Sequence, residues 1–258
     1  MRYFALLLPL LGAIACAPSA STPSNPESAT TTLTVSAAAS VQDALRDIQV
    51  AYQAESPEVT VVYNFGSSGS LAQQIAQGAP VDIFLSASQP WMDRLAAEGA
   101  IREASRRDLL QNVMVLVAPA DSAIASFEDL GTDAADKVAV GEPDSVPAGG
   151  YAKEVLTTLG LFEALQPKLV FAKDVRQVLS YVETGNVDAG LVYATDAQIS
   201  GGVEVLATAP PDSHAPIVYP VAIAQDSAQV AVAEDFLTFL STDTATEIFQ
   251  DYGFSRVD

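Results

Sequence analysis

Two short segments place serine hydroxyl groups directly before predicted helices. In residues 36–40, Ser40 precedes Val41-Gln42-Asp43 and fits a capping box, with Ser40 as the N-cap and Asp43 at the third helical position. In residues 65–70 (FGSSGS), Ser68 stands among glycines and serines just before Leu71. Such segments can offer a ligand both hydroxyl groups and unpaired backbone N–H groups.

Three further segments also stand at predicted element ends. Residues 146–150 (VPAGG) contain Ala148, residues 172–175 (AKDV) end at Val175, and residues 192–196 (VYATD) leave a strand at Tyr193. Helix N-termini carry about half a unit of positive charge, so several of them at one cleft would bind an anion without Lys or Arg. A fully ionised oxyanion needs only donors, whereas phosphate at neutral pH keeps a proton that needs an acceptor.

Each segment also has a purely structural interpretation. A serine before a helix is commonly only a cap, worth about 1 kcal/mol. The GSSGS run can be a flexible turn, and it does not fit the G-x-S-x-G nucleophile pattern. Residues 147–149 can be a loop with a proline that starts a helix. The residues alone therefore leave two alternatives open, a convergent anion site and a set of ordinary caps.

Composition argues against several function classes. The 258 residues hold 12 Lys+Arg against 32 Asp+Glu, and the net charge of −20 disfavours nucleic acid and anionic membrane surfaces as partners. One His and one Cys exclude a Cys/His zinc site and an internal disulfide. The alternative to a binding protein is an enzyme, for example a hydrolase that uses Ser68 and His214. His214 lies in the proline-rich run APPDSHAP, so we expect a surface residue, no catalysis and no cofactor.

Short apolar strands alternate with amphipathic helices from Leu33 onward, which predicts an α/β protein. Strands are expected at 33–35, 59–63, 81–85, 113–117, 137–140, 169–171, 189–192, 203–206 and 218–222, and helices at 41–54, 71–76, 90–97, 150–159, 175–182, 228–240 and 243–251. The alternation restarts near residue 137 without a sequence repeat, so two similar lobes are predicted. Ligands of such sheets bind beyond the carboxyl ends of the strands, and often between domains.

The first residues have the pattern of a targeting segment. Met1-Arg2 and the apolar run at residues 3–14 predict a signal peptide over residues 1–15. The small residues before Cys16 resemble a bacterial lipobox, although Ala13 stands where that motif usually has Leu, and this implies lipidation of Cys16. Ordinary cleavage with Cys16 unused is the alternative. Residues 16–32 are small, polar or proline apart from one Glu, and a flexible tether is expected there.

Eight ordered segments together resemble the periplasmic molybdate-binding proteins that serve ABC importers. They are LTVSAAASVQDAL (33–45), FGSSGSLAQQI (65–75), GAPVDIFLSASQPWMDRL (78–95), AVGEPDSVPAGGYAKEVL (139–156), KDVRQVLSYVE (173–183), GLVYATDA (190–197), DSHAPIVYPVAI (212–223) and EIFQDYGF (247–254). The resemblance spans residues 33–257. Single motifs are modest, but the ordered set is specific.

The resemblance implies a type II periplasmic binding protein, with two α/β lobes joined by crossover strands and a ligand cleft between them. Lobe 1 would comprise residues 33–115 plus 220–258, and lobe 2 residues 116–219. A tetrahedral oxyanion, molybdate and also tungstate, would be bound through its oxygens, with no direct metal ligand. Its contacts fall on Ser40, Ser68, Ala148, Val175 and Tyr193.

The resemblance also implies partners and a location. An ABC permease with its ATPase would receive the oxyanion from an extracytoplasmic, membrane-anchored monomer. The alternative ligand is another tetrahedral oxyanion such as sulfate, phosphate or chromate. Gly69 departs from the family pattern, which commonly has Ser or Thr there. The acidic residues near the five segments are expected to face solvent or cap helices; they are Glu142, Asp144, Asp174 and Asp196.

Overall fold

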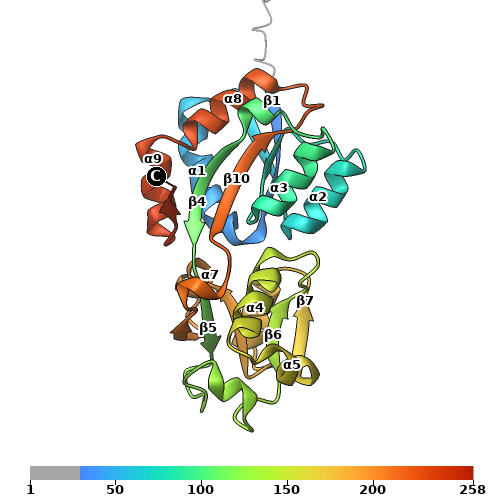
Figure 1. Cartoon of the computed structure of the whole chain (residues 1–258). Coiled ribbons are helices and arrows are strands. Elements are labelled where there is room, and N and C mark those ends of the chain that lie inside the picture. Colours follow the sequence, from blue (N-terminus) through green and yellow to red (C-terminus); the bar gives the residue numbers. More distant parts are fainter. Residues whose placement is uncertain (1–29, 258) are drawn as a thin grey trace, which may run out of the picture.

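The structure, a computed structural model, describes residues 30–257 and contains two sheets, one in each of two lobes (Figure 1). The prediction of two α/β lobes is confirmed. The signal peptide and Cys16 lie outside the described residues. The predicted tether ends earlier than expected, because β1 already begins at Thr31.

The first sheet has six strands in the order β11-β4-β10-β3-β1-β2. They are β1 (Thr31–Ala38), β2 (Val59–Gly66), β3 (Ile83–Leu85), β4 (Arg107–Asn112), β10 (Ile217–Ile223) and β11 (Ser255–Arg256). β1 runs parallel to β2 and β3, whereas β10 runs antiparallel to β3 and β4. The helices of this lobe are α1 (Gln42–Glu55), α2 (Ser68–Ala76), α3 (Gln89–Ala97), α8 (Val230–Phe239) and α9 (Asp243–Asp251).

The second sheet has five strands in the order β7-β6-β8-β5-β9. They are β5 (Met114–Ala118), β6 (Val138–Gly141), β7 (Leu169–Ala172), β8 (Ala189–Tyr193) and β9 (Glu204–Thr208). Its helices are α4 (Pro147–Thr158), α5 (Phe162–Leu165), α6 (Val175–Glu183) and α7 (Ala194–Gln198). β6 is parallel to β7 and β8, and β5 is antiparallel to its neighbours β8 and β9.

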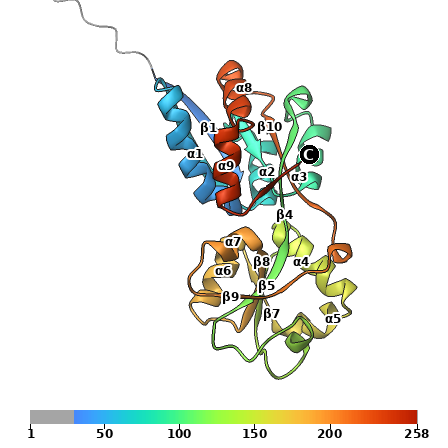
Figure 2. The same ribbon diagram turned by 90° about the vertical axis from the view of Figure 1, so that its left-hand side faces the viewer.

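The chain crosses between the lobes twice. The first crossing is at Val113, which separates β4 of the first sheet from β5 of the second. The return crossing joins β9 to β10 through residues 209–216. Figure 2 shows both crossings as narrow links between the two bodies. The division into domains stays a prediction; the sheets themselves place Met114 with the second lobe and Ile217 with the first.

Apolar spacing explains how the first lobe is covered. α1 buries Ala44, Leu45, Ile48 and Tyr52, which recur with the helical period and share one face. The Tyr52 ring meets the Phe236 ring of α8 edge-on at 4.9 Å between centroids. The Tyr252 hydroxyl group, just after α9, donates to Asp47 of α1 at 2.7 Å. The two C-terminal helices therefore pack beside α1, as Figure 2 shows.

Most predicted elements are present, with differences at the ends. α2 and α4 begin about three residues before their predicted starts, at Ser68 and Pro147. β4, β11, α5 and α7 were not predicted from the sequence. Gly78 (φ 86°) and Gly99 (φ 68°) follow α2 and α3 in the left-handed region and end these helices.

The capping box predicted at the start of the first helix is wrong. Val41 is the N-cap of α1, and no side chain caps this helix. Ser40 instead belongs to a short 3-10 turn, Ala39–Val41, and its hydroxyl group bonds to Tyr219 of β10. A long-range partner has therefore replaced the local one.

Candidate functional site

All five residues expected to contact an oxyanion line one pocket. Ser40 and Ser68 come from the first lobe, and Ala148, Val175 and Tyr193 from the second. The structure thus brings the five predicted residues together at the seam between the lobes.

Strand register explains why residues so far apart in sequence meet here. Ala38, the last residue of β1, pairs with Gly66, the last of β2, and Ala37 pairs with Leu85, the last of β3. The residues two positions after these strands are Ser40, Ser68 and Ala87, so they line the same edge of the sheet. Parallel β6 and β7 likewise end together at Gly141 and Ala172, ahead of α4 and α6.

Three helix N-termini point at the pocket. α2 begins at Ser68, α4 at Pro147 and α6 at Val175, and each of these residues lines the pocket. First-turn N–H groups have no acceptor within their own helix, and the helix dipole makes this end partly positive. α2 and α6 are also capped by residues of the pocket lining, with Ser67 accepting from Ser70 N–H and Asp174 accepting from Gln177 N–H.

The hydroxyl group of Ser68 is oriented as a donor. Its Oγ accepts a hydrogen bond from the Ala87 N–H at 2.9 Å. A serine hydroxyl has one proton and acceptor lone pairs, so a hydroxyl that accepts from the protein keeps its proton for another partner. The side chain is fully buried and lines the pocket, which leaves a ligand there as that partner.

A short chain of hydrogen bonds holds the Ser40 hydroxyl group. The Asn112 amide donates to the Tyr219 hydroxyl oxygen at 3.2 Å, and the Tyr219 hydroxyl lies 3.0 Å from Ser40 Oγ. Either hydroxyl group can donate in the Ser40–Tyr219 hydrogen bond. When Tyr219 donates, the Ser40 proton is available toward the pocket. The Asn112 amide is itself fixed, since its Oδ1 accepts from the Val113 N–H at 2.9 Å.

The Tyr193 hydroxyl group is the most direct sign that the pocket takes a ligand. The side chain is 1% exposed, and within residues 30–257 its hydroxyl group has no hydrogen-bond partner. A buried hydroxyl without a partner costs free energy that a ligand can recover. Burial, with nearby Asp196 and Tyr219, holds its pKa well above the usual value, so it stays protonated and can donate.

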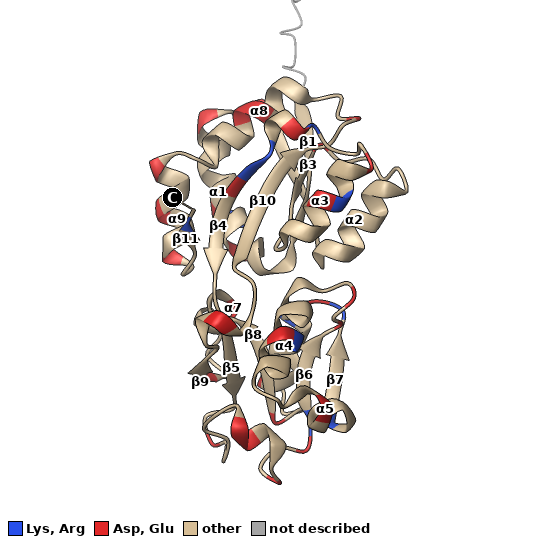
Figure 3. Cartoon of the chain, in the orientation of Figure 1, with Lys and Arg blue, Asp and Glu red and all other residues tan. Residues whose placement is uncertain are grey.

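The pocket contains donors but no cationic side chain. Among the residues that line it, all within the described part of the chain, none is Lys, Arg or His. Figure 3 shows acidic residues distributed over both lobes. Asp174 is the one carboxyl group in the lining, and it caps α6 as predicted. The site therefore offers hydrogen bonds and helix dipoles rather than positive side chains.

The prediction for Asp196 is wrong. Its side chain is fully buried, neither facing solvent nor capping a helix, and its Oδ1 lies 2.7 Å from Arg176 Nε. Burial raises the pKa of Asp196 to about 7, against the Arg176 charge, which favours the carboxylate. The carboxyl group points to Arg176 and is not part of the pocket lining.

Comparison with known proteins identifies the family to which this two-lobed chain belongs. The family described as bacterial extracellular solute-binding proteins matches residues 33–255, nearly all of the described chain. The chain belongs to this family. The expectation of a binding protein rather than an enzyme is confirmed.

Two relatives of this solute-binding protein show where it lies within the family. It is 47% identical over 226 residues to a protein of Bacillus subtilis named a putative ABC transporter substrate-binding lipoprotein, YvgL, covering 87% of this chain and 86% of that one. It is 44% identical over 229 residues to the molybdate-binding protein ModA of Escherichia coli, covering 86% and 88%.

Solved structures agree with the fold. The substrate-binding domain of a putative molybdenum ABC transporter from Clostridium difficile matches with a TM-score of 0.69 at 42% identity, covering 89% of this chain and all of that one. The periplasmic molybdate-binding protein of Azotobacter vinelandii matches with a TM-score of 0.79 at 26% identity, covering 88% and 100%. The sulfate-binding protein SubI of Mycobacterium tuberculosis, at 18% identity, TM-score 0.75 and 88% of each chain, shares the fold.

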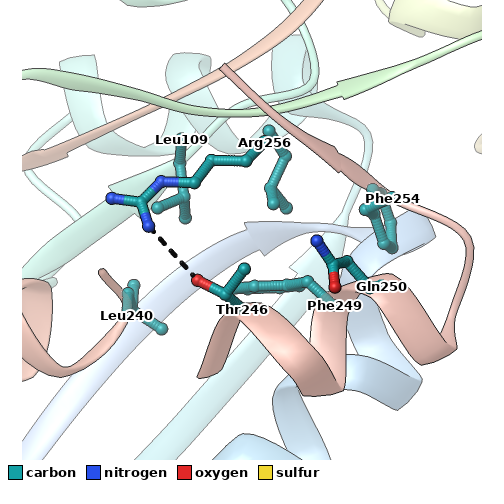
Figure 4. Close-up of a pocket in the computed structure, with 8 residues that line it drawn as sticks. Leu109, Leu240, Thr246, Phe249, Gln250, Phe254 and Arg256 are labelled. Atoms are coloured by element: carbon teal, nitrogen blue, oxygen red, sulfur yellow. Dashed lines mark hydrogen bonds between the residues drawn. The ribbon is translucent and has the colours of Figure 1, made fainter. Parts of the chain in front are cut away.

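Other hollows of the solute-binding protein do not collect the predicted residues. Figure 4 shows one in the first lobe, where apolar side chains such as Phe249 and Phe254 meet Arg256, which donates to Thr246 at 3.4 Å. His214 lines a different hollow from Ser68 and packs edge-on against Tyr151, so no Ser68–His214 pair forms. Within residues 30–257 there is no cluster of three metal-ligating side chains and no helix able to span a membrane.

Sequence reasoning missed the residues that support the pocket from behind. Asn112 and Tyr219 were not singled out, and Asn112 also donates to Thr195 of the second lobe at 2.9 Å. Ala87 was also not singled out, although the strand before it was predicted, because its backbone N–H gains its role only through Ser68. Their roles depend on contacts with residues far away in the sequence, so no local pattern marks them.

Proposed function

We propose that this solute-binding protein captures molybdate, and also tungstate, between its two lobes and delivers it to an ABC permease with its ATPase. The observation that carries the proposal is a pocket rich in neutral donors. Three helix N-termini, the Ser68 hydroxyl group that accepts from Ala87 N–H, the Ser40 hydroxyl group and the unpartnered Tyr193 hydroxyl group surround it. The names of the ModA relatives supply the identity of the oxyanion.

A site of this kind favours an oxyanion without protons. Every oxygen of such an anion can accept from N–H and O–H groups, so each donor finds a partner. Hydrogen phosphate would bring one proton that needs an acceptor, and the one carboxyl group in the lining is Asp174, whose Oδ1 caps α6. The rest of the site is made of helix N-termini and hydroxyl groups, so we expect phosphate to bind more weakly than molybdate. Sulfate and chromate satisfy the same donors, and only the size of the closed pocket separates them from molybdate.

A melting series tests the choice of ligand. A ligand that binds only the folded protein stabilises it by RT ln(1 + [L]/Kd), so the melting temperature rises with the logarithm of the ligand concentration once that exceeds Kd. We expect molybdate and tungstate to raise the melting temperature at micromolar concentrations, with little change from sulfate, chromate or phosphate. A larger shift with sulfate would keep the site but change the ligand. No shift with any of the five would overturn the proposal.

Serine variants test which groups bind. Ser40→Ala or Ser68→Ala should weaken molybdate binding by about 1–3 kcal/mol, because a buried anion would lose one donor. Ser70→Ala is the matched control, since Ser70 lies on the same helix and bonds only with Ser67. Equal affinity for the wild type and both pocket variants would remove these hydroxyl groups from the site.

We further propose that the mature protein is anchored to the membrane through a lipid on Cys16. The proposal is supported by the lipobox-like residues before Cys16 and by the lipoprotein named among the relatives. Cys16→Ser should move the protein from the membrane fraction to the soluble extracytoplasmic fraction. Retention of this variant in the membrane fraction would contradict lipid anchoring.

A further inference from the structure

Among the described residues, 30–257, Arg176 is the guanidinium group beside the pocket that reaches across the seam. It follows Val175 on α6 of the second lobe, and its Nη1 lies 2.8 Å from Asp43 Oδ2 on α1 of the first lobe. Its Nη2 also donates to the Ser40 backbone carbonyl at 3.2 Å. The side chain is 22% exposed and that of Asp43 29%, so the pair is partly shielded from water.

Within its own lobe Arg176 has a second carboxyl partner. Its Nε lies 2.7 Å from Asp196 Oδ1, at the start of α7, in an ion pair whose atoms are not aligned for a hydrogen bond. Two carboxyl groups therefore share the guanidinium group, which is absent from the pocket lining. This arrangement explains why a cation so close to an anion pocket does not bind the anion itself.

Both ends of the cross-lobe pair keep a partner if the lobes separate. Arg176 retains Asp196, and Asp43 retains Arg46, whose Nη1 lies 3.5 Å from Asp43 Oδ1 on the same helix. Separation then exposes no uncompensated charge, so the contact can form and break repeatedly. The Ser40 carbonyl contact ties the same event to one of the proposed ligand residues.

We propose that Arg176 and Asp43 form a clasp that holds the two lobes closed over the bound oxyanion, with Arg176 a positioning residue rather than a ligand contact. This inference rests on the proposed function and deepens it. The clasp acts on the closed state alone, so it slows ligand release and leaves ligand entry nearly unchanged. A role in folding a single lobe would not have this kinetic signature.

The chain carries its own reporter for this motion. Trp91 is the single tryptophan, and it lines a groove at the seam together with Tyr151 of the second lobe. Stopped-flow fluorescence of Trp91 with molybdate gives the association rate constant, and titration calorimetry gives Kd. Their product is the dissociation rate constant.

The test is a double-mutant cycle on the purified protein. Asp43→Asn should speed molybdate release about two- to fivefold, the size expected for a partly exposed ion pair, with the ligand-free melting temperature unchanged. In an Arg176→Met background, Asp43→Asn should have no further effect, because its partner is gone. Glu98→Gln is the matched control, since it breaks an ion pair of Arg94 at 2.9 Å within one lobe, and release should not change.

Three results would overturn the inference. Release from Asp43→Asn at the wild-type rate would show that the cross-lobe pair does not hold the closed state. Equal effects of Asp43→Asn with and without Arg176 would assign its effect to another contact. Third, a wild type that fails to bind molybdate would overturn the proposed function as well, which distinguishes it from failure of the clasp alone.

Arg176→Met leaves Asp196 buried without its cation and can lower stability. The comparison of Asp43→Asn with the wild type does not use this variant and is unaffected.

Discussion

Serine hydroxyl groups bind anions well only when their protons are directed at the ligand, and the two pocket serines achieve this differently. Ser68 accepts from a backbone N–H two residues after β3, so its orientation follows from the sheet itself. Ser40 depends on the side chains of Tyr219 and Asn112. The hydrogen bond between Tyr219 and Ser40 can be removed by one substitution at Tyr219, which is not a residue of the pocket lining.

Tyr219→Phe should weaken molybdate binding by about 1 kcal/mol, because Ser40 Oγ loses its donor and its proton is no longer directed at the ligand. The affinity for hydrogen phosphate should rise relative to molybdate, since Ser40 Oγ could then accept the phosphate proton. Calorimetric titration with both anions measures the ratio. Tyr63→Phe is the control, because Tyr63 donates to the Leu45 carbonyl at 3.0 Å, away from the pocket. An unchanged ratio in Tyr219→Phe would contradict the role of the hydrogen-bond chain.

The buried carboxyl group of Asp196 predicts a pH dependence of stability. Burial raises its pKa from 3.8 to about 7, opposed by Arg176 and assisted by Asp43 and Asp174. Between these values the folded protein binds more protons than the unfolded chain, so this contribution is fully present below about pH 4 and is lost as the pH rises toward 7. Relative to Asp196→Asn, the wild type should lose up to about 4 kcal/mol of unfolding free energy across this range.

Denaturant unfolding of wild type and Asp196→Asn without ligand, at intervals between pH 4 and 8, checks this sign. The difference between the two proteins removes the contributions of the other carboxyl groups. A difference that grows in favour of the wild type as the pH rises would contradict a raised pKa. The substitution leaves the contact of Arg176 with Asp43 in place.

At the scale of elements, the first turn of α2 fixes how closely the lobes approach. The Gly69 N–H donates to the Ser145 carbonyl of the second lobe at 3.0 Å. A Cβ at position 69 would overlap that carbonyl oxygen and lie 2.6 Å from Trp91 Cζ2. Gly69 is therefore a contact point across the seam.

Gly69→Ala should impair closure and weaken molybdate binding by about 1–3 kcal/mol, because backbone atoms on the facing lobe must move. Gly150→Ala is the matched control: its added Cβ would lie 3.6 Å from the Pro143 carbonyl, an ordinary contact, on helix α4. Calorimetry on both variants is the measurement. Equal affinity in Gly69→Ala and the wild type would show that the lobes have room to spare at this point.

Elements with a strong local pattern could be predicted from the sequence, and those without one could not. β5 has the sequence MVLVA and is buried throughout, and this apolar run was sufficient to predict the strand. β4 reads RDLLQN, with charged and polar residues at both ends, and was missed. α7 has five residues, too few to show a helical period. The capping box at Ser40 failed because a partner 179 residues away took the hydroxyl group.

The candidate site was better predicted than its support. All five expected residues line the pocket, since each stands at the end of a strand or the start of a helix, where the sequence pattern is visible. The supporting contacts of Tyr219, Asn112 and Arg176 join elements far apart in the chain. Topology creates these contacts, and no local pattern of residues reports them.

At the scale of the whole molecule, charge opposes the proposed ligand. The net charge of −20 repels a dianion at long range, while the neutral donors of the pocket act only at contact. The association rate constant for molybdate should therefore rise with ionic strength, because salt screens the repulsion over about 10 Å at 0.1 M. Stopped-flow fluorescence of Trp91 in about 10 mM to about 500 mM salt measures this rate constant. An association rate constant that falls as salt is added would contradict the prediction, because it would show that molybdate is attracted by positive charge near the pocket.

The central claim is that the pocket between the lobes binds a fully ionised oxyanion through neutral donors, and that this anion is molybdate. The most direct test is calorimetric titration of the purified protein, freed of bound anion, first with molybdate and then with sulfate. The account predicts one molybdate per chain, with a Kd far below that of sulfate and a marked loss of affinity in Ser68→Ala. Preference for sulfate, or full molybdate affinity in Ser68→Ala, would contradict it.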